Sequence, residues 1–354
     1  MNAIRILRRP RVLIVGCGDV GLRCARRLLA RSAPPRIIAL TTRPERAAQL
    51  RAEGLTPIVG DLDAPRTLRR LAALSATVLH LAPPPPHGDD DPRTRALIAA
   101  LGTRRPHRPA RSGAPGAGRL QTRRQAARLA PETRLFAACG GARAQARIVP
   151  EALSRAWPRP RLRLVYASTT GVYGDCAGAF IDETRPAKPA NARAKRRVAA
   201  ERRLRRANAR GAMTASIVRI PGIYARERLP LARIGQGKPA LVEDQDVYTN
   251  HIHADDLAAI MLRAAVRGRP GRVVHASDDT VLKMGAYFDR VADAFGLSRV
   301  PRITREAAQA LLDPATLSFM RESRRLSNVR LKHELGVALR YPTVDDFLGS
   351  LHAP

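Results

Sequence analysis

The sequence predicts an α/β fold in which a parallel, doubly wound sheet carries a small C-terminal lobe. Short apolar runs alternate with amphipathic stretches at the spacing of β-α-β units, which favours a parallel sheet. A glycine-rich turn directly follows the first apolar run. Later in the chain, short strands and helices alternate less regularly, as expected of a mixed lobe over the strand ends.

The N-terminal part of the chain supplies most of the regular pattern. The apolar run 11–15 is a predicted strand, and residues 22–31 are a predicted helix because Leu22, Ala25 and Leu28 recur at helical spacing. Further strands are expected at 37–40, 56–59 and 77–81, with helices at 45–53 and 67–74. In the C-terminal part, strands are expected at 162–167, 215–220 and 273–276, and helices at 192–210, 255–266, 284–295 and 305–311.

Residues 102–160 interrupt this pattern. They consist largely of Arg, Ala, Pro and Gly and keep no sustained period, and a loop of this length is unusual inside a compact domain. We expect a disordered insertion or an artefact of a shifted reading frame, and no function is assigned to it. The main domain is therefore expected over 11–222 and the lobe over 223–350, with 250–276 returning to the main domain.

The charge of the chain is unusually positive. Its 354 residues include 63 Lys and Arg against 30 Asp and Glu, which gives a net charge of +33. Such a charge is typical of nucleic-acid binding, but aromatic residues make up only 4% and offer few rings on which bases could stack. We therefore expect a small-molecule substrate rather than nucleic acid as the main partner.

Three features bear on the cellular compartment. No apolar stretch approaches the roughly 20 residues that span a bilayer, and residues 1–10 lack the apolar centre of a signal peptide. The four cysteines show neither metal-binding spacing nor a disulfide framework. We expect a cytoplasmic protein without a membrane partner.

The most specific motif is Gly16-Cys17-Gly18-Asp19-Val20-Gly21, which follows a predicted strand and opens a predicted helix. This context is that of a Rossmann-type dinucleotide site, so all six residues are expected at the cofactor. Gly16 would allow the tight turn, Gly18 would let the backbone approach a pyrophosphate, and Gly21 would permit close helix packing. A glycine-rich turn without a ligand remains the alternative.

The end of the second predicted strand indicates which dinucleotide is bound. An NAD site usually has an acidic residue there to bind the ribose 2′-hydroxyl, but this chain has Thr41, Thr42 and Arg43. Arg43 can pair with a 2′-phosphate, so NADP is expected, with NAD as the second possibility. A solvated Arg43 without a ligand is the alternative.

Several further motifs occur in the order typical of one enzyme family. They are Gly60-Asp61-Leu62, Ser168-Thr169-Thr170-Gly171-Val172-Tyr173-Gly174, Arg219-Ile220-Pro221-Gly222-Ile223-Tyr224 and His251-Ile252-His253-Ala254-Asp255-Asp256. Together with the glycine motif, they resemble an extended or atypical short-chain dehydrogenase/reductase of the NAD-dependent epimerase/dehydratase family. The resemblance covers residues 11–101 and 162–350.

This resemblance implies the roles of further residues. The positions that would surround the adenine and its ribose are Asp61, Leu62, Leu81 and Ala82. Pro221 and Ile223 would flank the nicotinamide, and Thr169 would be the catalytic Ser/Thr, although capping of a strand end would also explain this threonine. Members of this family often dimerise through a helix like the one expected at 192–210, so the resemblance also implies a homodimer.

The catalytic Tyr-x-x-x-Lys of the family is altered here. Lys195 lies on a predicted helix, but the residue four positions earlier is Asn191, whose amide cannot act as an acid or base. Lys195 could still bind the nicotinamide ribose, so we keep it in the expected site. Tyr173 and Tyr166 lie nearby in sequence as alternative proton donors, although tyrosines in such positions are more often packing residues.

The cluster His251, His253, Asp255 and Asp256 could suggest a metal site, but its resemblance to the family's structural motif before a helix favours no metal. The resulting functional prediction is an NAD(P)-dependent oxidoreductase or epimerase/dehydratase-like enzyme, acting on a sugar nucleotide or a similar polar substrate. The alternative is a catalytically weak or silent NADP(H)-binding sensor or scaffold protein.

Overall fold

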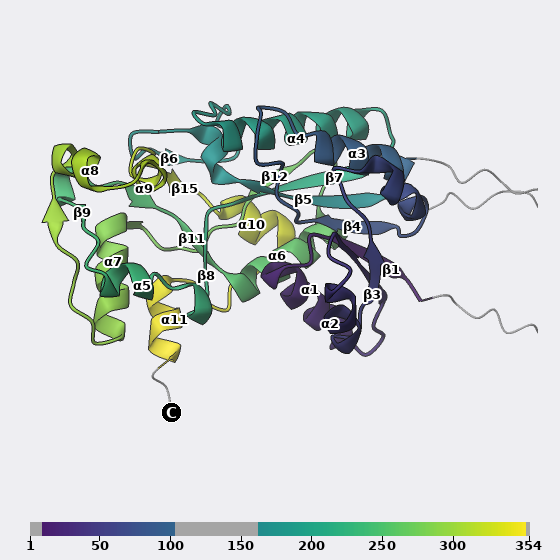
Figure 1. The fold of residues 1–354 in the computed structure, drawn as a ribbon, viewed down its shortest axis with the longest axis horizontal. Coiled ribbons are helices and arrows are strands. Elements are labelled where there is room, and N and C mark those ends of the chain that lie inside the picture. Colours follow the sequence, from purple (N-terminus) through teal and green to yellow (C-terminus); the bar gives the residue numbers. More distant parts are fainter. Residues whose placement is uncertain (1–8, 103–161, 352–354) are drawn as a thin grey trace, which may run out of the picture. The chain divides into compact units, whose positions relative to one another are not determined.

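The computed structural model describes residues 9–102 and 162–351, and its centre is a seven-stranded parallel sheet (Figure 1). The strands of this sheet are β1 Arg11–Val15, β2 Arg36–Thr41, β3 Thr56–Val59, β4 Thr77–His80, β5 Arg163–Thr169, β7 Thr214–Ile220 and β12 Val273–His275. Their order is β12-β7-β5-β4-β1-β2-β3, and all neighbours pair in parallel. The predicted α/β class with a Rossmann-type, doubly wound sheet is therefore confirmed.

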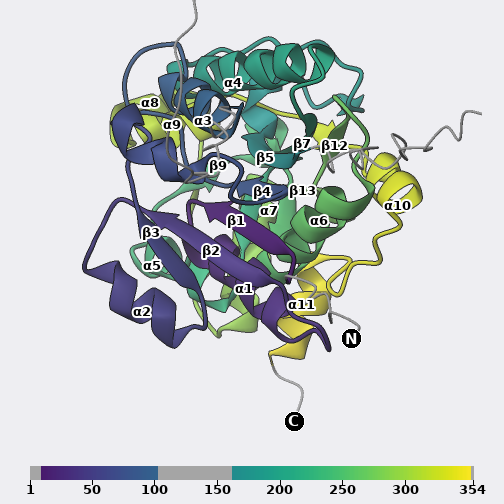
Figure 2. The ribbon, with the colours of Figure 1, turned by 90° about the vertical axis from the view of Figure 1, so that its right-hand side faces the viewer.

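Helices cover both faces of the sheet (Figures 1 and 2). One face carries α1 Asp19–Leu29, α2 Arg46–Ala52, α6 Ala254–Arg267 and α10 Val329–Leu335. The other carries the 3₁₀ helix η1 Pro65–Leu71, α3 Pro92–Gly102 and α4 Ala192–Ala209. Within β1, Val12 and Ile14 pack toward the first face and Leu13 and Val15 toward the second. This two-sided burial explains why the strand is continuously apolar.

The C-terminal lobe consists of short helices and two-stranded pairings beyond the carboxyl ends of the sheet (Figure 1). Its helices are α5 Leu231–Gly235, α7 Met284–Ala294, α8 Arg305–Leu311, α9 Pro314–Phe319 and α11 Val344–Ser350, with the 3₁₀ helices η3 Arg226–Arg228 and η4 Glu243–Gln245. A separate hydrophobic core joins α5, α7 and α11.

Four small pairings and one further 3₁₀ helix, η2 Thr170–Tyr173, connect this lobe to the sheet. The parallel pairs are β6 Phe180–Ile181 with β15 Arg325–Leu326, β8 Gly222–Tyr224 with β11 His251–His253, and β9 Ala240–Leu241 with β14 Arg302–Ile303. The antiparallel pair is β10 Tyr248–Thr249 with β13 Leu282–Lys283. The first two parallel pairs place C-terminal segments beside η2 and the end of β7.

The sequence predictions differ from the structure in a few places. The helix expected at 67–74 is the 3₁₀ helix η1, and α3 was not predicted. Asp91 starts α3 by accepting a hydrogen bond from the Thr94 amide at 3.0 Å, with Pro92 at the first helical position. Apart from Gly102, the insertion expected at 102–160 lies outside the described residues.

Candidate functional site

The glycine-rich turn joins the end of β1 to α1, and part of its backbone faces open space. Gly16 has a φ of +88°, and a Cβ there would lie 2.4 Å from the Ala82 amide nitrogen, so only glycine fits. A Cβ on Gly18 would meet no atom within 4 Å. Gly21 approaches Gly16 closely, whereas Val20 packs against the core. Because α1 starts without a side-chain cap, its first amides can bind a phosphate.

The other residues expected at the adenosine lie at neighbouring strand ends. Leu81 and Ala82 follow β4, and both of their amides donate to the Val15 carbonyl oxygen, at 2.8 and 2.9 Å. Asp61 and Leu62 follow β3, with Leu62 buried and Asp61 only half-buried. The structure therefore brings these residues to the same edge of the sheet as the glycine-rich turn.

Two arginines follow β2. Arg43 is exposed just beyond the strand, where its amide donates to the Thr41 hydroxyl at 3.2 Å. Arg46, the first residue of α2, donates from Nη2 to the Cys17 carbonyl oxygen of the glycine-rich turn at 3.2 Å. Arg46 was missed because its sequence position gives no sign of this contact. Burial raises the pKa of the Cys17 thiol to about 11, so the thiol stays neutral.

Asp19, within the glycine motif, takes part in a network of ion pairs. Its carboxylate pairs with Arg23 at 2.7 Å and with Arg228 at 2.9 Å. Arg23 also pairs with Asp255 at 2.6 Å and with Glu227. The network fastens η3 and the start of α6 to the first turn of α1. The negative charge of Asp19 is therefore compensated within the protein.

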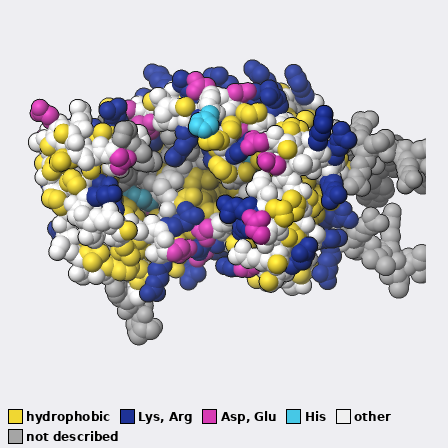
Figure 3. Space-filling view, in the orientation of Figure 1, with side chains coloured by type: hydrophobic (Ala, Val, Ile, Leu, Met, Phe, Trp, Pro, Cys, Tyr) yellow, Lys and Arg dark blue, Asp and Glu magenta, His cyan; other side chains and the backbone are white. Residues whose placement is uncertain are grey.

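A cavity of about 490 Å³ lies at the ends of β5 and β7, between the sheet and the C-terminal lobe. Its volume is typical of a small-molecule site. Figure 3 shows a hollow near the middle of the molecule, with hydrophobic atoms at its floor and charged side chains around its rim. The described residues that line the cavity are Thr169, Thr170, Gly171, Asn191, Arg193, Ala194, Pro221, Gly222, Tyr248, Thr249, Asn250, His251, Met284, Tyr287, Phe288, Ser318, Glu322 and Arg324.

Two of the residues expected around the nicotinamide lie at this cavity. Thr169 ends β5 and Pro221 follows β7, and both line the cavity. The Thr169 hydroxyl accepts a hydrogen bond from the Gly171 amide at 3.3 Å, which caps η2. Its proton is not used in that bond, so the hydroxyl can still donate to a ligand. Ile223 packs against the core and is only half-buried.

The side chains at the start of α4 that line the cavity include Asn191 and Arg193, whereas Asn191 and Lys195 occupy the positions of the family's Tyr-x-x-x-Lys. Asn191 caps α4 by accepting a hydrogen bond from the Ala194 amide at 2.9 Å, and Arg193 lines the cavity. Lys195 is exposed, pairs with Asp89 at 3.1 Å, and is not among the described lining residues. Residues two apart on a helix point about 200° apart, so Arg193 and Lys195 cannot share this cavity. The structure does not bring Lys195 beside Thr169.

The two tyrosines considered as proton donors are buried elsewhere. The Tyr173 hydroxyl bonds to His275 Nε2 at 2.5 Å, and the Arg219 guanidinium lies 4.6 Å from the centre of its ring. The Tyr166 hydroxyl accepts from Arg197 at 3.1 Å. Burial raises the pKa of both tyrosines to about 12. Neither belongs to the described residues that line the cavity.

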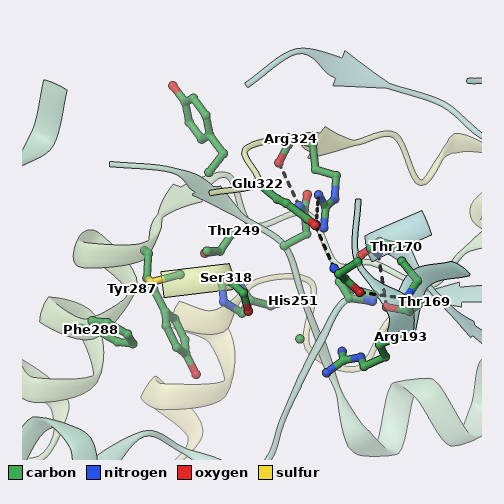
Figure 4. Close-up of a pocket in the computed structure, with 18 residues that line it drawn as sticks. Thr169, Thr170, Arg193, Thr249, His251, Tyr287, Phe288, Ser318, Glu322 and Arg324 are labelled. Carbon is green, nitrogen blue, oxygen red and sulfur yellow. Dashed lines mark hydrogen bonds and ion pairs between the residues drawn. The ribbon is translucent and has the colours of Figure 1, made fainter. Parts of the chain in front are cut away.

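A carboxylate that the sequence did not single out lies in this cavity. Glu322 accepts from the Asn191 side-chain amide at 3.3 Å and pairs with Arg324 at 2.9 Å (Figure 4). Its side chain is 13% exposed. Glu322 lies 131 positions from Asn191, and no motif marks it. Only the folded lobe brings the two residues together.

The histidine and aspartate cluster has structural contacts. His253 caps α6 by accepting from the Asp255 amide at 3.2 Å, and Asp256 accepts from two backbone amides just before α11. His251 stacks on Tyr287 with a ring separation of 4.2 Å, and burial lowers its pKa to about 4. Within residues 9–102 and 162–351, no group of three or more His, Cys, Asp or Glu side chains is arranged to hold a metal ion. None of the helices described there is long and apolar enough to cross a membrane.

Comparison with protein families gives two matches along the chain. Residues 142–276 match the NAD dependent epimerase/dehydratase family, and residues 12–109 match the TrkA-N domain. The first match contains Thr169 and Asn191, and the second contains the glycine motif. A comparison with proteins of curated function finds no match.

Solved structures share the fold over nearly the whole chain. A functionally unknown conserved protein from Silicibacter pomeroyi is 25% identical, with a TM-score of 0.67, and the match covers 97% of this chain and 98% of the other. UDP-glucose 4-epimerase from Thermotoga maritima, solved with UDP-glucose, is 12% identical, with a TM-score of 0.64 and 96% of both chains covered. A dTDP-glucose 4,6-dehydratase from Streptomyces venezuelae, solved with NAD, is 17% identical, with a TM-score of 0.65 and coverages of 96% and 95%.

Proposed function

We propose that this chain, which is of the NAD-dependent epimerase/dehydratase type, is an NADP(H)-linked oxidoreductase or epimerase-like enzyme acting on a polar small molecule. The observation that carries the proposal is the position of the glycine-rich turn and the Thr169 cavity at one edge of the sheet. In open α/β sheets, ligands bind beyond the carboxyl ends of the strands, where the strand order reverses. In this sheet the order reverses between β1 and β4.

The fit of a dinucleotide rests on the backbone around the glycine-rich turn. The free space at Gly18 and the uncapped first turn of α1 leave room and hydrogen-bond donors for a pyrophosphate. Arg43 and Arg46 follow a strand end that carries Thr41 rather than a carboxylate, which supports a 2′-phosphate and therefore NADP over NAD. When bound, this cofactor supplies hydride transfer.

The chain's own residues would bind and orient the substrate beside the cofactor. Thr169 has a hydroxyl proton available for a substrate oxygen, and Pro221 forms the adjoining wall. Asn191 cannot transfer a proton because its side chain is an amide. The cavity also contains aromatic rings and the charged side chains Arg193 and Arg324. These features support a substrate with an anionic group and a planar ring, such as a sugar nucleotide.

One observation favours a second candidate function. The general acid position expected on α4 is Asn191, and Lys195 points to Asp89 instead of the cavity. A protein that binds NADP(H) without turnover, as a sensor or scaffold, would tolerate these changes. Turnover separates the two functions, because a sensor would bind the dinucleotide without oxidising or reducing it.

The test combines binding and turnover. Thermal unfolding is measured with NAD, NADP, UDP-glucose and dTDP-glucose, because a ligand at 100 times its Kd adds about 2.7 kcal/mol to the free energy of unfolding. Turnover is then followed at 340 nm with NADPH and 4-nitrobenzaldehyde, and with NADP and UDP-glucose. Stabilisation by NADP together with turnover supports the enzyme, and stabilisation without turnover supports the sensor. No stabilisation by either dinucleotide would overturn both.

A further inference from the structure

We propose that Glu322 is the residue that exchanges a proton with the substrate oxygen in the Thr169 cavity. This inference rests on the proposed function, because it needs a nicotinamide cofactor beside the cavity. It assigns the acid–base role to a carboxylate of the C-terminal lobe, since Asn191 on α4 cannot perform it.

The position of Glu322 is the first support. Its Oε1 accepts from Asn191 Nδ2 at 3.3 Å, so the carboxylate lies directly beside the position where the family resemblance implies a tyrosine. Its Oε2 would lie only 3.9 Å from a Cβ on Gly171, two residues after Thr169. Because Gly171 has no side chain, it leaves the space between the carboxylate and the end of β5 open.

The second support is the rigid attachment of the segment that carries Glu322. The Ser323 amide donates to the Asp175 carboxylate at 2.8 Å, and the Ser323 carbonyl accepts the amides of Cys176 and Gly178, both at 3.0 Å. Arg324 donates from Nη1 both to the Gly174 carbonyl oxygen at 2.7 Å and to Glu322. The segment is thus fixed to the loop after η2. A catalytic group held in this way needs little reorganisation.

The chemistry of the other side chains around the cavity is the third support. Arg324 lies on the same segment, and Arg193 faces Glu322 from α4 with an electrostatic interaction between them. A guanidinium group does not act as a proton acid or base in proteins, so neither arginine can take this role. The other titratable groups that the structure describes at the cavity are Tyr287, whose pKa burial raises, His251, which is buried and stacked on Tyr287, and Tyr248, whose ring centre lies 4.8 Å from the Arg325 guanidinium. Glu322 is the one carboxylate among the described lining residues, and it is therefore the group best suited to exchange the proton.

The proton and electron balance of the step is simple. In the oxidative direction, the O–H bond of a secondary alcohol breaks and its proton moves to the Glu322 carboxylate. The C–H bond breaks, a C=O bond forms, and the hydride leaves to an oxidised nicotinamide dinucleotide. The Glu322 carboxyl group then returns its proton to water in the cavity. In the reductive direction, the protonated carboxyl group gives its proton to the new alkoxide.

The experiment compares Glu322→Gln with a matched control, Glu306→Gln. Glu306 lies on α8 of the same lobe, is exposed, and is not among the described lining residues. Both variants are expected to keep the wild-type Kd for NADPH, measured by fluorescence titration. With NADPH and 4-nitrobenzaldehyde, Glu322→Gln should lose about 10²–10⁴-fold in kcat, the typical contribution of a positioned acid or base. Glu306→Gln should match the wild type.

Two further measurements separate proton exchange from a structural role. Formate should restore part of the turnover of Glu322→Ala, because a small carboxylate can enter the vacated space. In protein labelled with ¹³C at the glutamate δ-carbon, the resonance missing from Glu322→Gln should shift when the aldehyde is added. Rescue by formate together with this shift would support the role.

Distinct results would overturn the inference and the proposed function. A wild type that binds no dinucleotide overturns the proposed function. If the wild type binds NADPH, either an absence of aldehyde turnover or full turnover by Glu322→Gln overturns the role of Glu322 and leaves the cofactor site intact. An absence of both formate rescue and the carbon shift, with turnover lost, also overturns it by indicating a structural role.

Discussion

At the end of β1, the candidate site is made of backbone: Gly16, where a Cβ would overlap the Ala82 backbone, Gly18, which open space surrounds, and the uncapped first turn of α1. At the ends of β5 and β7, the site is made of side chains from distant segments, with Thr169 on β5, Asn191 on α4 and Glu322 in the lobe. The first region offers backbone amides, which every residue except proline possesses. The second depends on which side chain each segment contributes, so one substitution can change its chemistry while the fold is retained.

The tyrosine position illustrates this difference. Asn191 still starts α4 as a capping residue, a structural role for which Asn is well suited. Compared with the tyrosine that the family resemblance implies here, Asn191 lacks an acid–base group, and the Glu322 carboxylate accepts a hydrogen bond from its side-chain amide at 3.3 Å. In the backbone-made region, Gly16 offers no such freedom, because a Cβ there would lie 2.4 Å from the Ala82 amide nitrogen.

The largest expected effects come from adding a methyl group to the glycine-rich turn. Gly16→Ala should lower the free energy of unfolding by about 2–6 kcal/mol, because its φ is positive and its Cβ would overlap the Ala82 backbone. Gly18→Ala is the control, since open space surrounds its Cβ position. It should weaken the binding of NADPH without a comparable loss of stability. Urea unfolding and fluorescence titration measure the two effects. Equal stability of the two variants would contradict the steric overlap inferred at Gly16.

A pH-dependent change in the free energy of unfolding is expected from Asp278, which follows β12. Burial raises the pKa of Asp278 to about 7, from an ordinary value of 3.8. The folded state therefore holds a proton that the unfolded state releases, and the contribution of Asp278 to stability falls as pH rises from about 4 to 7. The total is on the order of 4 kcal/mol. Asp278→Asn should remove this part of the pH dependence in urea unfolding, and an unchanged pH profile would contradict it.

The sequence was sufficient to predict the sheet and the glycine-rich turn for a physical reason. Strands β1 to β4 are short apolar runs separated by local helices, and the residues of the turn are consecutive in the chain, although the close contact that fixes Gly16 comes from Ala82. Thr169 was also predictable, because the family resemblance gives its place in the chain. Its position at the cavity agrees with that expectation, while its catalytic role stays a prediction.

The cavity could not be assembled from the sequence alone. Glu322 reaches Asn191 only because the segment after α9 folds back onto the loop following η2. Lys195 was expected at the site from its spacing to Asn191, but the helix turns it toward Asp89. Arg193, two residues earlier on the same helix, faces the cavity instead. Spacing along the chain gave no information about which of these side chains would face the lobe.

An intermediate effect is expected for Arg43, which tests the choice of dinucleotide. Arg43→Ala should weaken the binding of NADPH by about 1.5–3 kcal/mol, the range for a hydrogen bond to a charged group. The binding of NADH should barely change. Arg46→Ala is the companion variant, because Arg46 contacts the Cys17 carbonyl of the turn. Equal losses of NADPH and NADH affinity for Arg43→Ala would remove the reason for preferring NADP.

The smallest change in NADPH affinity and stability is expected for a substitution of Lys195. This substitution tests most directly whether the side chains around the cavity depend on how each segment folds. Its ion pair with Asp89 is exposed, with 48% and 61% of the two side chains accessible, and such pairs contribute about 0–1 kcal/mol. If the side chain remains turned toward Asp89, Lys195→Ala should leave the Kd for NADPH and the unfolding midpoint nearly unchanged. Arg193→Ala, in the cavity on the same helix, should instead reduce turnover. A large loss of NADPH affinity in Lys195→Ala would show that the side chain turns toward the ribose on binding. The lysine of the family pattern would then act here without its tyrosine.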